Sequence, residues 1–140
     1  MTRVLYDTNV ILDVLFHREP FWPPSSVALA QAGRGKVEGY ISAHAVTTLA
    51  YLLETRFGSS KSRRLITELL MKLEIAPVTD AVIRAALARP MSDFEDAVTH
   101  EAALEAKVSV IVTRDVHGFR RSSIPAVRSE ERRVGKECRL

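Results

Sequence analysis

The chain has 140 residues, of which 46% are hydrophobic and 26% charged, with 6 Gly, 6 Pro and one Cys. This length and composition are typical of a single globular domain. They exclude collagen-like, low-complexity, broadly disordered and disulfide-stapled proteins. The formal net charge is +3, but most of this basicity lies in the last thirteen residues. The sequence has no run of 18 apolar residues and no apolar leader, so we expect a cytoplasmic protein with no membrane partner.

Short apolar runs alternate with helical patterns along the chain. In order, the sequence predicts a strand at 4–6, a helix at 10–16 capped by Thr8 or Asn9, a helix at 25–32, a strand at 39–42, helices at 45–57 and 65–73, a strand at 75–78, a helix from Thr79 to Arg89, a helix at 92–107, and strands at 108–113 and 124–127. This alternation favours an α/β fold with a parallel sheet between two layers of helices.

Acidic residues follow two of the apolar strands. Asp7 comes directly after the first strand, and Asp115 follows the run at 108–113. Because ligands bind beyond the carboxyl ends of parallel strands, both side chains are expected at one edge of the sheet. Asp93 and Asp96 open a helix three residues apart and share a face of it. Carboxylates from separate segments that converge in this way suit Mg²⁺ or Mn²⁺ and the hydrolysis of a phosphodiester.

Each acid also has a structural interpretation. Asp93 fits a helix start, where the dipole favours acids, and Glu95 fits the capping box that begins at Ser92. Asp13 and Glu19 are expected on the solvated surface. An acid after a strand is often a turn or cap residue, so the convergence of several acids carries the prediction rather than any one of them.

Three motifs resemble those of the PIN domain family, in the same order and across Val4 to Val127. They are LYDTNVILD at 5–13, FEDA at 94–97 followed by Ala102 and Ala103, and VTRD at 112–115 with Phe119. The resemblance implies a PIN-like three-layer fold with a central parallel sheet. It also implies an Mg²⁺- or Mn²⁺-dependent ribonuclease similar to the VapC-type toxins of prokaryotic toxin–antitoxin pairs, usually a homodimer, with RNA as substrate and an antitoxin protein as partner.

The same resemblance implies a role for each site residue. Asp7 and Asp96 would bind metal, Asp115 would complete the site directly or through water, and Asp93 would be an outer ligand. Thr8 and Asn9 would orient Asp7, while Thr113 would support the site or contact phosphate.

One position departs from the family pattern. The family usually has a glutamate on the helix after the second strand, where this chain has Thr48. Glu54 lies six residues further, about 600° around the helix, and therefore points elsewhere. We count Thr48 among the supporting residues, and the departure bears on activity rather than on fold.

Basic, aromatic and histidine side chains near these motifs are less specific. Position alone makes Arg114, Arg120 and Arg121 candidates for RNA-backbone contacts. His100 follows Asp96 by one turn, and a structural role is favoured over a ligand role; His17, His44 and His117 show no metal-ligand spacing. The basic helix start at Lys61, Arg63 and Arg64 favours a solvated face over RNA contact, and Phe21 and Trp22 favour packing.

The C-terminal residues 128–138 read RSEERRVGKEC and resemble, over all eleven residues, the in-frame translation of a common sequencing adapter. We therefore expect a PIN-like domain at 1–127 and a non-native tail at 128–140. The alternative is a natural basic arm that binds RNA or a partner.

Three functions are compatible with these residues. The first is a metal-dependent endoribonuclease, the toxin of a type II toxin–antitoxin pair. The second, prompted by Thr48, is a non-catalytic PIN-like module that binds RNA or protein. The third is a phosphohydrolase that uses Asp7 as its nucleophile, but the chain lacks an evident second half for that chemistry. Metal-dependent cleavage that is lost in Asp7→Asn would separate the first two.

Overall fold

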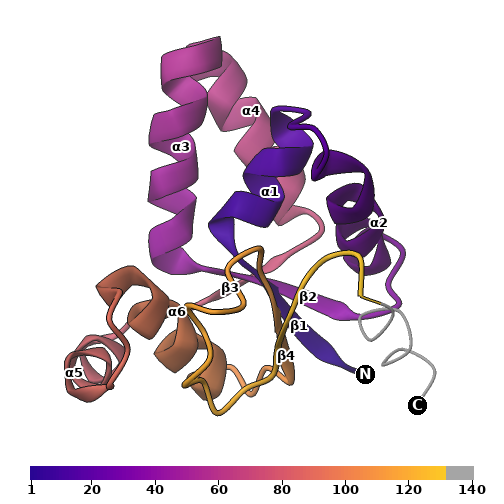
Figure 1. Ribbon diagram of the computed structural model, residues 1–140. Coiled ribbons are helices and arrows are strands. Elements are labelled where there is room, and N and C mark those ends of the chain that lie inside the picture. Colours follow the sequence, from indigo (N-terminus) through magenta and orange to yellow (C-terminus); the bar gives the residue numbers. More distant parts are fainter. Residues whose placement is uncertain (132–140) are drawn as a thin grey trace.

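The computed structural model describes residues 1–131; the rest of the expected tail lies outside the described residues. Within them the elements are, in chain order, β1 (Arg3–Tyr6), α1 (Thr8–Leu15), α2 (Trp22–Gly33), β2 (Glu38–Ser42), α3 (Ala43–Phe57), α4 (Ser59–Leu70), β3 (Glu74–Ala76), α5 (Asp80–Ala88), α6 (Phe94–Glu105), β4 (Val110–Val112) and β5 (Ala126–Val127) (Figure 1). The predicted alternation of strands and helices is confirmed.

The strands form one sheet in the order β3-β2-β1-β4-β5, and every pairing is parallel. β1 lies at the centre, with Leu5 opposite Tyr40 of β2 and Ile111 of β4. The chain first builds outward from β1 through β2 to β3, and then returns to the other side of β1 to add β4 and β5. The strand order therefore reverses between β1 and β4, which is where open α/β sheets bind ligands.

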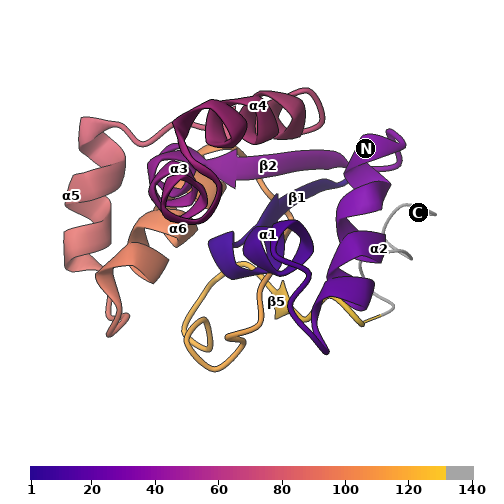
Figure 2. The ribbon, with the colours of Figure 1, turned by 90° about the horizontal axis from the view of Figure 1, so that it is seen from above.

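Helices cover both faces of the sheet. Figure 1 shows α1 to α4 above the sheet and α5 and α6 below it, and Figure 2 shows the first group from above. Because side chains alternate along a strand, Val4 and Tyr6 pack into the core under α1 to α4, whereas Leu5 packs against α5 and α6. The predicted three-layer α/β architecture is thus confirmed. Among the described residues, no helix is long and apolar enough to cross a membrane.

Two helix starts differ from the prediction. Asp7 caps α1, in place of Thr8 or Asn9, and its carboxylate accepts a hydrogen bond from the Thr8 amide at 2.9 Å. α6 begins at Phe94, and its cap is Asp93, which accepts from the Asp96 amide at 3.0 Å. The capping box that was expected to engage Glu95 does not form. In both helices the N-cap is one of the acidic residues that the sequence predicts for the site, so the same side chain caps a helix and belongs to the candidate site.

The expectation that Asp13 lies on the solvated surface is wrong. Its side chain is fully buried in α1, with Arg114 Nε 3.0 Å and Arg18 Nη1 3.8 Å from its two carboxylate oxygens. Burial raises the pKa of Asp13, and the two guanidinium groups partly offset that shift. Asp13 therefore ties α1 to the residues that follow β4. Glu19 is exposed, as expected, and accepts from Trp22 Nε1 at 3.0 Å.

Candidate metal centre

An acid-lined cleft of about 280 Å³ lies beyond the carboxyl ends of the central strands. Three of its lining residues follow strands: Asp7 comes directly after β1, His44 two residues after β2, and Asp115 after β4. Asp96, in the first turn of α6, also lines the cleft. The residues that line it are Asp7, Thr8, Asn9, Leu12, His44, Thr48, Leu52, Asp93, Glu95, Asp96, Thr99 and Asp115. The structure thus brings together the four acids that the sequence analysis selected, from three separate segments of the chain.

Asp7 is held in a fixed orientation at the floor of the cleft. Its Oδ1 accepts from the Thr8 amide, and its Oδ2 accepts from the Thr113 hydroxyl at 2.9 Å. Thr113 is itself fully buried, so it supports Asp7 and is not placed to touch a substrate phosphate. Burial raises the pKa of Asp7, and these two hydrogen bonds oppose the shift by favouring the carboxylate.

Asp96 carries the most strongly perturbed carboxyl group of the site. Burial is the largest cause, and repulsion from neighbouring carboxylates adds to it, so the pKa of Asp96 rises to about 7. The repelling residues are Asp7, Asp93, Asp115 and Glu95. A half-buried carboxyl group beside several other carboxylates is an environment that a bound cation would stabilise.

Asp115 approaches Asp96 across Gly118. The Gly118 amide donates to Asp115 Oδ1 at 2.9 Å. A Cβ atom at Gly118 would lie 2.4 Å from Asp115 Oδ2 and 3.1 Å from Asp96 Oδ2, so both oxygens crowd the same point. Gly118 therefore allows the two carboxylates to meet, because any side chain there would occupy the space between them. Gly118 was not among the site residues predicted from the sequence.

His44 and Thr48 form the α3 wall of the cleft, one helical turn apart. Thr48 occupies the place where a carboxylate was expected, and its hydroxyl donates to the His44 carbonyl at 3.3 Å. His44 Nδ1 is buried without a hydrogen-bond partner. Burial lowers the pKa of His44, while Glu95 and Asp7 act in the opposite direction. His44 shows no metal-ligand spacing in the sequence, although its position just after a predicted strand indicated this edge of the sheet.

Several candidate residues lie outside the cleft. Glu54 is exposed on α3 and does not line the cleft, as its angle around the helix predicted. Arg114 is paired with Asp13 and lies over the Phe21 ring, 4.2 Å from the ring centroid. Arg120 and Arg121 are exposed on the loop after β4. His100 is fully buried beneath that loop and is not among the lining residues.

The donor set fits a hard divalent cation in its chemistry. Carboxylate oxygens dominate the cleft, and neither a lysine nor an arginine is among the described residues that line it. Within residues 1–131, no three His, Cys, Asp or Glu side chains are close enough together to form a finished ligand cage.

The fold and the acidic cleft at the strand-order reversal define a class of α/β domain built around clustered carboxylates. The model of the PIN domain family matches residues 3–117, so the chain belongs to the PIN domain family. Among curated proteins, none matches the sequence significantly.

Solved structures share the fold at low sequence identity. A toxin–antitoxin complex from Klebsiella pneumoniae is 18% identical with a TM-score of 0.68, and covers 91% of this chain and 98% of that chain. VapBC-1 from nontypeable Haemophilus influenzae is 16% identical with a TM-score of 0.67, covering 94% and 100%. The Sarcin-Ricin loop cleaving toxin VapC20 of Mycobacterium tuberculosis is 14% identical with a TM-score of 0.61, covering 77% and 86%.

Proposed function

We propose that this protein is a metal-dependent endoribonuclease and the toxin of a type II toxin–antitoxin pair. The observation that carries the proposal is the convergence of Asp7, Asp96 and Asp115 in one cleft, with the pKa of Asp96 raised to about 7. Membership of the PIN domain family supports it, as do the structural neighbours, which include toxin–antitoxin complexes and an RNA-cleaving toxin.

In this mechanism Asp7, Asp96 and Asp115 would hold Mg²⁺ or Mn²⁺, and Asp93 would be an outer ligand. The bound ion would activate water and stabilise the charge that develops on the phosphodiester. Thr113 and the Thr8 amide fix the orientation of Asp7, and Asn9 and Thr48 line the cleft beside it. Asp96 would hold the ion as a carboxylate, so protonation below its raised pKa of about 7 would compete with the metal.

The proposal extends to the substrate and the partners. Arg120 and Arg121 are exposed on the same loop as Asp115, and this exposure supports the proposal that they contact the RNA backbone. Arg114 is the weaker candidate because Asp13 already neutralises its charge. A cognate antitoxin, a homodimeric assembly and a cytoplasmic location complete the proposal, by analogy with the VapC-type toxins. The domain that acts is 1–127, and residues 128–140 are a non-native tail.

A second function is favoured by one observation, which is Thr48 in the cleft wall. With a threonine where the family usually has a glutamate, the cleft has one carboxylate fewer. A cleft that holds too little negative charge to bind an ion would leave a non-catalytic module that binds RNA or protein.

The test uses cleavage of a mixed RNA pool by the protein ending at Val127, with Mg²⁺, with Mn²⁺ and with EDTA. Asp7→Asn and Asp96→Asn remove ligands, and Asp80→Asn, at an exposed helix position, is the matched control. We expect metal-dependent cleavage by the wild type and the control, and loss of at least about 100-fold in either site variant. Metal binding is measured separately by calorimetry. A folded wild type that neither cleaves nor binds metal establishes the non-catalytic module instead.

A further inference from the structure

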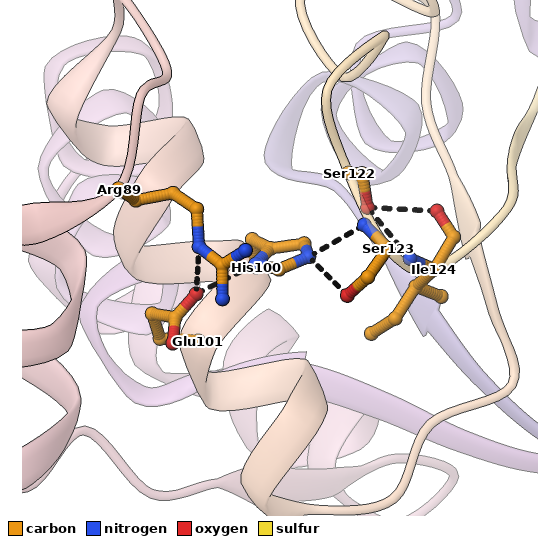
Figure 3. Close-up of polar contacts among 6 residues, drawn as sticks. All are labelled: Arg89, His100, Glu101, Ser122, Ser123 and Ile124. Atoms are coloured by element: carbon orange, nitrogen blue, oxygen red, sulfur yellow. Dashed lines mark hydrogen bonds and ion pairs between the residues drawn. The ribbon is translucent and has the colours of Figure 1, made fainter.

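A chain of polar contacts runs from α5 to the loop after β4 through the buried face of α6. Arg89 Nε donates to Glu101 Oε2 at 2.8 Å, and His100 Nδ1 lies 2.7 Å from the same oxygen (Figure 3). On the other side of the ring, His100 Nε2 accepts from the Ser123 amide at 3.1 Å and lies 3.1 Å from the Ser123 hydroxyl. His100 itself is fully buried.

The contacts define the protonation of the imidazole. A backbone amide can only donate, so His100 Nε2 must be the acceptor toward Ser123. The ring proton therefore sits on Nδ1 and is donated to Glu101. Although burial raises the pKa of Glu101, hydrogen bonds from His100 and Arg89 hold it below its ordinary value, so Glu101 is the ionised acceptor that this tautomer needs.

This chain of contacts connects two parts of the acidic cleft. His100 lies one helical turn after Asp96 on α6, and Ser123 belongs to the loop that carries Asp115 and Gly118. Apolar side chains also anchor the loop, since Phe119 and Ile124 are buried against α6 and its neighbours. A hydrogen bond between a buried ring and one backbone amide adds a directional contact, which fixes the position of the loop along the helix.

We infer that His100 is a positioning residue, which fixes the loop at 113–125 against α6 and thereby sets Asp115 relative to Asp96. The inference rests on the proposed function, because it assigns a role in assembling that same site. His100 does not touch the cleft, and it acts through Ser123 on the loop. Its second partner, Glu101, orients the ring in the way that outer-shell carboxylates orient histidines in metal sites.

Two substitutions separate the halves of the imidazole. In His100→Gln the side-chain oxygen can take the place of Nε2 and accept from the Ser123 amide. In His100→Asn the shorter side chain can take the place of Nδ1 and donate to Glu101, which leaves the Ser123 amide without its acceptor. Both variants remove the ring, and each removes the polar contacts on one side of it. If His100→Asn does not fold, His100→Leu replaces it. Leucine fills the buried space with an apolar side chain and contacts neither Glu101 nor Ser123 through a hydrogen bond.

Two readouts are measured on the full chain, alongside thermal unfolding. The first is the Mg²⁺ concentration that gives half-maximal RNA cleavage, together with calorimetric Mg²⁺ affinity. The second is the rate at which trypsin cuts after Arg120 or Arg121, which are exposed on the loop. We expect His100→Asn to raise both the Mg²⁺ requirement and the cutting rate about tenfold, and His100→Gln to stay within about threefold of the wild type at a similar Tm.

The outcomes distinguish this inference from the proposed function. If the wild type neither cleaves RNA nor binds Mg²⁺, the proposed function fails, while the trypsin assay still tests whether His100 anchors the loop. If the wild type is active but the Asn and Gln variants are equal in both assays, or the Gln variant is worse, His100 has no positioning role and the inference is overturned. Faster trypsin cutting in the Asn variant with an unchanged Mg²⁺ requirement also overturns it, because the loop would then move without affecting the site.

Discussion

Gly118→Ala is the substitution for which the structure gives the most definite expectation. The new methyl group would lie 2.4 Å from Asp115 Oδ2 and 3.1 Å from Asp96 Oδ2, and the first distance is shorter than any ordinary carbon–oxygen contact. The backbone does not resist the change, because the glycines with positive φ among the described residues are Gly35 and Gly58. The Asp115 side chain must therefore swing away by about 1 Å, a displacement that typically costs an active site about 100-fold in rate.

The same movement has little effect on stability. Asp115 is exposed and can rotate into solvent, so the main loss is the hydrogen bond from the Gly118 amide, about 1 kcal/mol. We therefore expect cleavage of a fluorescent RNA to fall about 100-fold in Gly118→Ala, with the free energy of unfolding lowered by no more than about 1 kcal/mol.

A second glycine provides the control. A Cβ atom at Gly33, the last residue of α2, would meet Lys72 Cδ at 3.5 Å, which is an ordinary contact. Gly33→Ala should therefore leave cleavage unchanged. Wild-type cleavage by Gly118→Ala would refute the reasoning, because it would mean that Asp115 need not approach Asp96. A loss in Gly118→Ala accompanied by unfolding would instead show that the glycine matters for the loop fold.

Three further predictions concern the charges and the boundary of the domain. Because the folded-state pKa of Asp96 is raised to about 7, the cost of its ionisation to folding grows between about pH 4 and 7 and is fully present above pH 7. Asp96→Asn should therefore raise the Tm in EDTA at pH 8 and leave it unchanged at pH 4, and equal shifts at both pH values would contradict this. Arg114→Met should destabilise by about 3 kcal/mol in urea unfolding, because it leaves the buried Asp13 carboxylate with only Arg18 Nη1 at 3.8 Å, whereas Arg84→Met, at the exposed pair with Asp80, should cost less than about 1 kcal/mol; equal losses would disprove the role of burial. Ending the chain at Val127 removes a 3.1 Å contact between the Ser129 and Ser25 hydroxyls. The free energy of unfolding, measured in urea, should therefore fall by about 1 kcal/mol. A larger loss would show that the tail belongs to the fold.

Residues at the ends of strands were predictable from the sequence. Asp7 and Asp115 each follow an apolar run, and a parallel sheet brings such positions to one edge. His44 follows β2 under the same rule, and it was set aside because a histidine without neighbouring ligands in the sequence gives no metal pattern. The position of a residue directly after a strand was therefore a better predictor that it lines the cleft than its residue type was.

Long-range partners were not predictable. Asp13 interrupts an apolar helix, which suggests exposure, but its partner Arg114 is about a hundred residues away and no local pattern connects them. His100 follows Asp96 by one turn, yet α6 is buried on nearly all sides from Ala97 to Ala103, so its next turn lies under the loop rather than in the cleft. Gly118 was not predictable for a related reason. The space that it leaves for the Asp115 and Asp96 carboxylates forms only when the loop packs against α6.

The two ends of the sheet limit how this protein can meet another chain. Its outer strands, β3 and β5, have only three and two residues, so they expose few backbone groups to which a foreign strand could add. Large apolar side chains such as Tyr51 on α3 and Leu87 on α5 are instead 67% and 70% exposed on the helical layers. Association with a second protein should therefore take place through helix surfaces, and strand addition at the sheet edge is disfavoured.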